Sequence, residues 1–124
     1  MDRRPASTMN DDRMWTSVDL ALEADALGQP LAGATRERAA RSLFQTETLG
    51  AVLTNLADGS FMENEQPDEP VTIQVVRGTC RITLGDERSE LRAGTLVAVS
   101  AGVVWRLEAT SPATVLVTVA SPRR

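Results

Sequence analysis

The sequence contains no histidine, no lysine and no tyrosine among its 124 residues. Without histidine, the chain lacks the usual proton shuttle at neutral pH and the commonest metal ligand of proteins. Without lysine there is no Schiff-base chemistry, and without histidine no serine–histidine or cysteine–histidine pair can activate a nucleophile. These absences exclude several of the most familiar kinds of catalytic site.

The sequence has only one cysteine, Cys80, which cannot form an internal disulfide. A single unpaired cysteine is typical of proteins from reducing compartments. The polar N-terminal residues show no signal peptide, and no apolar run approaches the roughly 18 residues that a membrane span requires. We therefore expect a cytoplasmic protein that does not bind membranes.

The chain carries a small net negative charge, and its basic residues are scattered along the sequence. The net charge is -4 with a pI near 4.8, and all thirteen basic residues are arginines spread along the sequence. Nucleic acids and anionic membranes bind most strongly to clustered positive charge, so we expect neither as a partner. The length and the hydrophobic content of 42% are typical of one soluble globular domain.

The N-terminal part is predicted to contain one short helix after a flexible leader over residues 1–14. Thr16 and Asp19 resemble a capping box, and Gly28 is suited to end the helix. The apolar stripe expected on this helix consists of Trp15, Val18 and Leu22. The stripe predicts a helix packed against the outside of the remaining domain, and the alternative is a helix that binds a partner. We expect an N-terminal extension over residues 1–37 and a single domain over 38–124.

From residue 38 onwards, strand-length apolar segments alternate with turns. The expected strands cover residues 38–46, 49–56, 71–76, 79–84, 89–92, 96–99, 103–107 and 113–120, with a further extended piece at 61–66. Cys80, Ile82 and Leu84 alternate with polar neighbours, which predicts that they face a core and that Cys80 is an unreactive buried thiol. About eight strands at this spacing predict an all-β jelly-roll barrel.

Four glycines divide this region in a recognisable way: Gly59, Gly78, Gly94 and Gly102. Their spacing resembles the two sequence motifs of the cupin superfamily. The strand Thr-Ile-Gln-Val-Val-Arg-Gly and the later Glu-Leu-Arg-Ala-Gly and Leu-Glu-Ala-Thr-Ser segments are similar to those of small stand-alone bacterial cupins, over about residues 38–120. The resemblance implies a cupin-type double-stranded β-helix, which is a jelly-roll barrel.

The resemblance also implies where the metal ligands of a cupin would stand. In the first motif these places hold Glu65, Pro67 and Val71, and in the second motif the histidine place holds Trp105. Soft and borderline metals prefer imidazole or thiolate ligands, which are absent from all four places. We therefore expect a barrel without a metal or any other cofactor.

Two glutamates and a tryptophan are candidate site residues. Glu63 and Glu65 are two residues apart, so we expect them on the same strand face, where they would hold a hard cation, act as acid and base, or simply be solvated. Trp105 is predicted to point into the barrel, where its indole N–H would donate to Glu65. The indole either fills the core or forms an aromatic wall for an apolar or planar ligand.

The remaining candidates are apolar. Together with Glu65 and Trp105, the predicted ligand-binding residues are Val71, Ile73 and Leu107. A cavity lined in this way would be dry and suited to a small hydrophobic molecule, and the alternative is that these side chains form only the core.

The sequence leaves enzymatic activity open and favours a non-catalytic role. The leading hypothesis is a metal-free protein that binds a small apolar ligand. The alternatives are a cofactor-independent isomerase or cyclase, with Glu65 or Glu63 as general base in an apolar pocket, and a regulatory protein-interaction module. We expect a homodimer, because the strand from Val71 to Val76 is apolar on both faces apart from Thr72 and Gln74.

Overall fold

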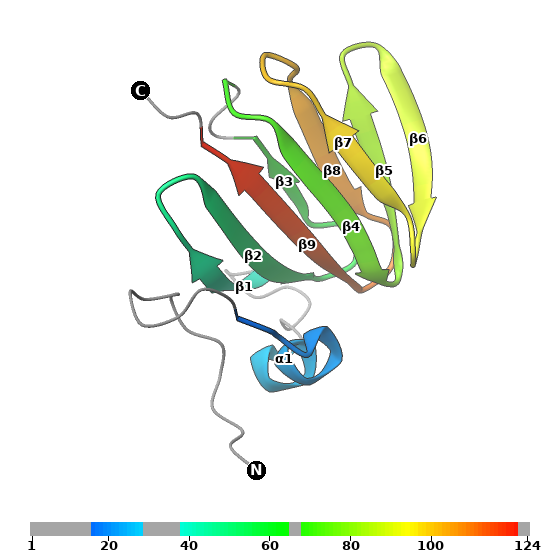
Figure 1. Cartoon of the computed structure of the whole chain (residues 1–124). Coiled ribbons are helices and arrows are strands. Elements are labelled where there is room, and N and C mark those ends of the chain that lie inside the picture. The colour runs from blue at the N-terminus through cyan, green and yellow to red at the C-terminus, as the bar shows by residue number, and fades with distance from the viewer. Residues whose placement is uncertain (1–15, 29–37, 65–67, 122–124) are drawn as a thin grey trace.

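The computed structural model describes residues 16–28, 38–64 and 68–121, which form two antiparallel β-sheets facing each other and one short helix, α1 (Figure 1). The first sheet has five strands in the order β1 (Arg38–Gln45), β2 (Leu49–Leu56), β9 (Ala113–Ala120), β4 (Val71–Arg77) and β7 (Leu96–Val99). The second has four, in the order β3 (Phe61–Glu63), β8 (Trp105–Ala109), β5 (Thr79–Leu84) and β6 (Glu87–Arg92). The predicted all-β fold with a short helix is therefore confirmed. The predicted boundary between extension and barrel, at 37/38, adjoins residues 29–37, which lie outside the described residues.

The last strand, β9, joins two strand pairs, β1–β2 and β4–β7, into one sheet. This strand lies between β2 and β4, pairing Leu56 with Ala113 on one side and Val75 with Val115 on the other. Because successive side chains of a strand point to opposite faces, this register gives the inward positions of β2, β4 and β9 one continuous surface.

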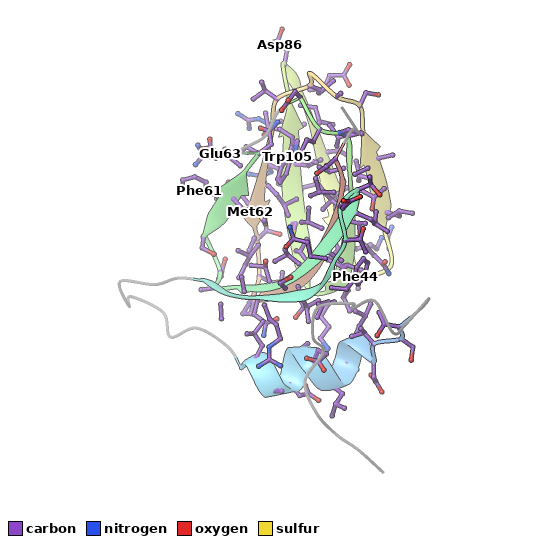
Figure 2. All side chains as sticks on the ribbon, turned by 60° about the vertical axis from the view of Figure 1, so that its left-hand side comes forward. Phe44, Phe61, Met62, Glu63, Asp86 and Trp105 are labelled. Atoms are coloured by element: carbon purple, nitrogen blue, oxygen red, sulfur yellow. The ribbon has the colours of Figure 1, made fainter. Side chains whose placement is uncertain are left out.

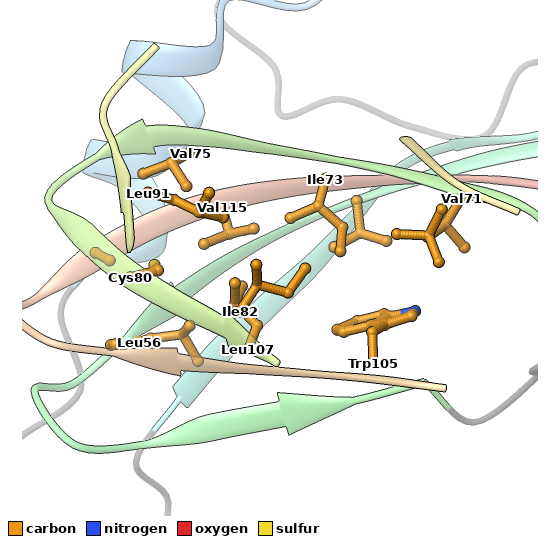
Figure 3. Close-up of a cluster of buried hydrophobic side chains, with 14 residues drawn as sticks. Leu56, Val71, Ile73, Val75, Cys80, Ile82, Leu91, Trp105, Leu107 and Val115 are labelled. Atoms are coloured by element: carbon orange, nitrogen blue, oxygen red, sulfur yellow. The ribbon is translucent and has the colours of Figure 1, made fainter. Parts of the chain in front are cut away.

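The hydrophobic core fills the space between the two sheets (Figure 3). It extends from Cys80 and Leu91 at one end to Val71 and Trp105 at the other. Cys80 and Ile82 are buried as predicted, and Leu84 packs against the edge of the core. Burial of each large apolar side chain stabilises the barrel by about 1.5–3 kcal/mol.

One glycine brings the sheets together at the closed end. Gly78 joins β4 to β5 with a φ of +79°, in the left-handed region that favours glycine. A Cβ atom at this position would overlap the carbonyl oxygen of Pro112 and stand 2.9 Å from Cα of Ala113. The close approach of these two turns therefore requires glycine for both its backbone angle and its lack of a side chain.

The helix α1 (Leu20–Leu27) begins later than the sequence predicted. Asp19 itself is the N-cap, and its carboxylate accepts a hydrogen bond of 3.1 Å from the backbone N–H of Leu22. This bond satisfies a backbone donor that the first turn of a helix leaves unpaired, so Asp19 fixes the start. Gly28 ends the helix as predicted, with a φ of +78°.

The helix covers the outer face of the first sheet over β1 and β2, as Figure 1 shows. The predicted stripe is only partly correct: Val18 packs there, but the buried helix residues are Glu23 and Ala24, while Trp15 lies outside the described residues. Ala24 packs against Leu43 and Leu53, and the carboxylate of Glu23 forms an ion pair of 2.9 Å with Arg41.

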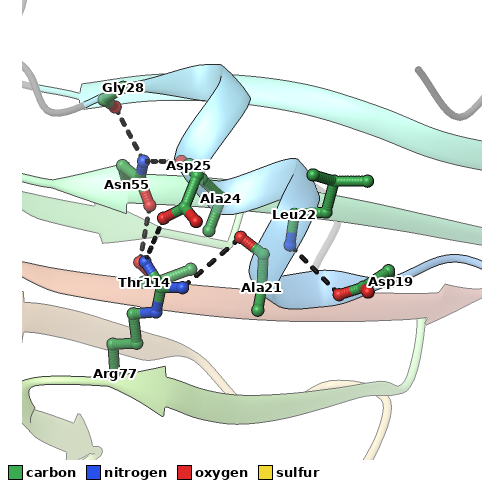
Figure 4. Close-up of polar contacts among 9 residues, drawn as sticks. All are labelled: Asp19, Ala21, Leu22, Ala24, Asp25, Gly28, Asn55, Arg77 and Thr114. Carbon is green, nitrogen blue, oxygen red and sulfur yellow. Dashed lines mark hydrogen bonds and ion pairs between the residues drawn. The ribbon is translucent and has the colours of Figure 1, made fainter. Parts of the chain in front are cut away.

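A buried polar group also anchors the end of α1 (Figure 4). The side-chain N–H₂ of Asn55, in β2, donates to the carbonyl oxygens of Ala24 and Gly28 at 3.1 and 2.7 Å. Helix C-termini leave carbonyl groups unpaired, and Asn55 satisfies two acceptors at once. On the surface, Arg77 adds an ion pair of 2.9 Å with Asp25.

Candidate functional site

A pocket of about 300 Å³ opens between the two sheets at the Trp105 end of the core. Its wall includes apolar side chains from six strands: Ala40, Val52, Met62, Val71, Trp105, Val117 and Val119. The polar residues of the lining are Thr54, Glu63, Asn64 and Glu69. No cationic residue is among those lining residues, so the pocket combines apolar walls with a few acceptor groups.

Trp105 forms one wall of this pocket. It is the first residue of β8, it points inward toward the strand that carries Val71 (Figure 3), and only 4% of it is exposed. Trp105 and Leu107 lie on the inner face of β8 while Arg106 is exposed, so the alternation predicted the direction of the indole correctly.

Asn64 holds the backbone around the tryptophan. Its Oδ1 accepts a hydrogen bond of 3.2 Å from the backbone N–H of Trp105, and its Nδ2 donates to the carbonyl oxygen of Val103 at 3.0 Å. One amide side chain therefore ties the end of β3 to the start of β8 and fixes the rim of the pocket.

Glu69 supplies the carboxylate at the pocket wall. One of its oxygens, Oε2, accepts a hydrogen bond of 2.7 Å from the hydroxyl of Ser121, just beyond β9. Oε1 has no protein partner among the described residues. Glu69 is half-buried, so this acceptor stands between the apolar lining and the solvent.

The structure distributes the predicted ligand-binding residues over two environments. Val71 and Trp105 line the pocket together. Ile73 and Leu107 lie deeper, are fully buried in the closed core and do not line the pocket. Glu65 and Pro67 lie outside the described residues.

Glu63 lies at the pocket rim, but its side chain points away from the barrel (Figure 2). Its Oε2 stands 3.8 Å from Nη1 of Arg106, and the Arg106 guanidinium lies 3.7 Å from the centre of the Phe61 ring. These three residues occupy the outer, solvent-facing side of β3 and β8, since Phe61 and Glu63 flank the inward Met62. The carboxylate of Glu63 is therefore paired on the surface.

Sequence reasoning missed the part of the pocket wall that β1, β2 and β9 supply, namely Ala40, Val52, Thr54, Val117 and Val119. The inward position of Val117 and Val119 was visible in the alternation along residues 113–120. Their closeness to β1 and β2 depends on strand pairing, for which the sequence carries no local signal.

The remaining titratable candidate is Cys80, which is fully buried. Burial disfavours the charged thiolate and raises the pKa of the Cys80 thiol to about 11. Within the described ranges, no group of three or more histidine, cysteine, aspartate or glutamate residues is placed to hold a metal ion. None of the helices in this part of the chain is long and apolar enough to cross a membrane.

A second, shallow groove of about 310 Å³ lies at the outer face of the five-stranded sheet, away from α1. Its lining residues include Leu49, Thr72, Ala98, Thr118 and Ala120. Leu49 is 41% exposed, and the nearby Leu96 of β7 is 64% exposed. The outer face of β4, β7 and β9 thus presents apolar and uncharged polar groups to the solvent.

No protein-family model matches the sequence, and no curated protein matches it. Solved structures do match. A conserved protein of unknown function from Streptococcus pyogenes has 20% identity and a TM-score of 0.71, over 98% of this chain and all of the other. A cupin superfamily protein from Desulfitobacterium hafniense has 15% identity and a TM-score of 0.70, over 94% of this chain and all of the other. KdgF from a Halomonas species has 17% identity and a TM-score of 0.65, over 94% of both chains. The chain therefore has the fold of a small single-domain cupin, as the glycine pattern predicted.

Proposed function

We propose that this cupin-fold chain binds a small, mainly apolar molecule in the pocket beside Trp105. The observation that carries the proposal is the pocket itself, with its apolar walls from both sheets and its polar groups at the rim. Its volume of about 300 Å³ is at the lower end of the range of ligand sites, so the occupant has about the size of one or two rings. A flat molecule would lie against the indole of Trp105.

Calorimetric titration with propylbenzene tests this proposal. For a molecule of nine non-hydrogen atoms, we expect a Kd on the order of 100 µM, from typical binding energies per atom. Val119→Phe would fill the pocket and abolish binding, because Val119 lines it. Thr83→Phe adds the same ring to the outer face of β5, opposite Arg106, and is the matched control. If neither propylbenzene nor a polar molecule of the same size binds, or if propylbenzene binds equally to the Val119→Phe variant, the proposal is wrong.

The acid–base alternative has less support than the binding role. Glu63 is paired with Arg106 on the outer side of the barrel, and its side chain points away from the apolar walls of the pocket. A general base must reach the proton that it removes, and this orientation does not suit a substrate in the pocket. Glu65 lies outside the described residues.

We also propose that the pocket works without a transition metal. Of the four places at which a cupin would hold its ligands, Val71 and Trp105 line the pocket and offer no lone pair to a metal. Elemental analysis of the purified protein should show far less than one equivalent of iron, nickel, copper or zinc per chain. Trp105→His alone should not change this result, because a single imidazole does not make a site.

We further propose that the chain forms a homodimer through the outer face of β4 and β7. The outward residues of these strands and of β9 include Thr72, Gln74, Leu96, Ala98 and Thr118, and none of these five is charged. Interface centres are depleted of charged residues, and a two-fold axis pairs one such surface with its own copy. By contrast, the outer face of β8 and β5 carries the charged residues Arg106, Glu108 and Arg81, which favour contact with solvent over burial in an interface.

The cytoplasm is the proposed location. Cys80 is a free buried thiol, and a single unpaired cysteine fits a reducing compartment. Fractionation of cells that produce the protein from its own gene would test this location.

A further inference from the structure

Among the described residues, the lining of the pocket carries acceptors but no cation, and this restricts which molecules the pocket can bind. The charged residues of its lining are Glu63 and Glu69, and the other polar groups are the hydroxyl of Thr54 and the amide of Asn64. Arg106 is held on the outer side of β8, over Phe61, and does not line the pocket. An anionic ligand would therefore lose its hydration without gaining a positive partner.

Glu69 has the geometry of a recognition group. Ser121 donates to Oε2 at 2.7 Å and orients the carboxylate, while Oε1 has no hydrogen-bond partner in the part of the chain that the structure describes. A half-buried carboxylate beside apolar side chains gains most from a charged donor, because hydrogen bonds between ionised groups are the stronger ones. An ammonium group meets this requirement.

Trp105 favours the same chemistry. Its indole is the only aromatic side chain among the lining residues that the structure describes, and the face of an indole attracts cations through its quadrupole. Val52, Val117 and Val119 provide the apolar surface for a hydrocarbon or aromatic body. The pocket thus offers two attractions to an organic cation, whereas its described lining offers no cationic partner to an organic anion.

We infer that the occupant of the pocket is a small aromatic or alicyclic amine, with its ammonium group between Glu69 and the indole of Trp105 and its ring against the valine side chains. This inference rests on the proposed binding function and narrows it to one ligand class. The amine is bound as the cation, so no proton or electron transfer is required.

Four probes of similar size and different charge test the inference by calorimetry: phenethylamine, 2-phenylethanol, propylbenzene and phenylacetate. At low salt, phenethylamine should bind at least about tenfold more tightly than propylbenzene, since a hydrogen bond between charged groups adds that much or more. Phenylacetate should show no binding. Added salt should weaken the binding of phenethylamine and leave that of propylbenzene unchanged.

Two variants separate the role of Glu69 from the general charge of the protein. Glu69→Gln should weaken phenethylamine binding about tenfold and leave propylbenzene unaffected, because it removes the charge and keeps the shape. Asp68→Asn removes the same charge from the adjacent, exposed residue, which does not line the pocket, and should change neither affinity.

The outcomes distinguish the inference from the function on which it rests. Equal affinities for phenethylamine and propylbenzene, or equal effects of Glu69→Gln and Asp68→Asn, would overturn the amine inference and leave a binding site for neutral molecules. Binding of phenylacetate in preference to the amine would also overturn it. Failure of all four probes to bind would remove the binding function itself.

Discussion

Thr114 and Asn55 share a hydrogen bond of 2.6 Å beneath α1, donated by the threonine hydroxyl to Oδ1 of the asparagine. Both side chains are fully buried. Because the oxygen of the Asn55 amide is fixed by Thr114, its N–H₂ group is turned toward the carbonyl oxygens of Ala24 and Gly28 (Figure 4). The end of the helix is thus attached to the barrel by a directional polar contact as well as by apolar packing.

Asn55→Ala should lower the free energy of unfolding by about 2–4 kcal/mol, because it leaves a buried hydroxyl and two carbonyl groups without this partner. Urea denaturation measures the change. Arg77→Ala is the comparison, since it removes the exposed ion pair to Asp25 at the same helix and should cost less than about 1 kcal/mol. Equal losses in the two variants would show that the buried amide has no special role.

Gly78→Ala should destabilise the protein far more than Gly102→Ala. Both glycines have a positive φ, so both substitutions carry the backbone cost of about 1–2 kcal/mol. Only at Gly78 would the new methyl group also overlap Pro112, whereas nothing lies within 4 Å of a Cβ at Gly102. We expect an additional loss of about 2 kcal/mol or more at Gly78, by analogy with overpacked cores. Similar melting temperatures for the two variants would contradict the close approach of the two turns.

Trp105→Ala should lower the free energy of unfolding by about 3–5 kcal/mol, as for other buried aromatic side chains. The position of the ring can be measured directly on a Trp15→Phe background, where Trp105 is the only tryptophan. Its emission should be blue-shifted and poorly quenched by iodide, because only 4% of the residue is exposed. Red-shifted emission with free quenching would place the ring in water.

Cys80 should not react with a water-soluble disulfide reagent at pH 8 unless the protein unfolds, since its thiol is buried and its pKa is raised to about 11. The raised pKa also has a consequence for stability. Above the ordinary pKa of about 9, the unfolded chain releases the thiol proton while the folded chain keeps it, so stability falls as the pH rises toward 11. Cys80→Ala should reduce this slope. Rapid labelling of the native protein would refute the burial.

Light scattering at micromolar concentration should give the mass of two chains. Leu96→Glu should reduce it to one, because Leu96 is 64% exposed and lies on the face proposed as the interface. Val104→Glu is the matched control, since Val104 is 65% exposed but lies in the loop before β8. A monomeric native protein, or dissociation by the control alone, would contradict the proposed interface.

Several strand positions were predictable from the sequence, because apolar segments of strand length end at turn residues. Residues 49–56 and 113–120 form β2 and β9 with the predicted bounds. The strand expected over 103–107 begins only at Trp105, because Val103 and Val104 are exposed after the turn. Apolar content alone predicted a strand there, whereas the hydrogen bonds of Asn64 determine where pairing starts.

The candidate site was predictable only in part, because local sequence patterns do not show which distant residues lie side by side. Trp105 and Val71 were found from the alternation and the motif spacing, and both line the pocket. Glu69 was not among the predicted site residues, since nothing in the local sequence shows that Ser121 lies beside it. Ile73 was expected to line the pocket, but the structure places it in the closed core, where it is fully buried. The position of a residue along the barrel depends on the strand register, which the local sequence does not show.

The place of β9 between β2 and β4 has a consequence for how the barrel assembles. β9 is the last of the described strands to be synthesised, yet both of its neighbours belong to the first two thirds of the chain. Until β9 is present, β2 and β4 have no shared partner, and the pocket lacks Val117 and Val119. Pairings between segments far apart in the sequence slow folding, because the entropy of closing the intervening chain is lost before the stabilising contacts form. The edges of β2 and β4 that later pair with β9 are therefore the places where an incompletely synthesised chain would first pair with another copy.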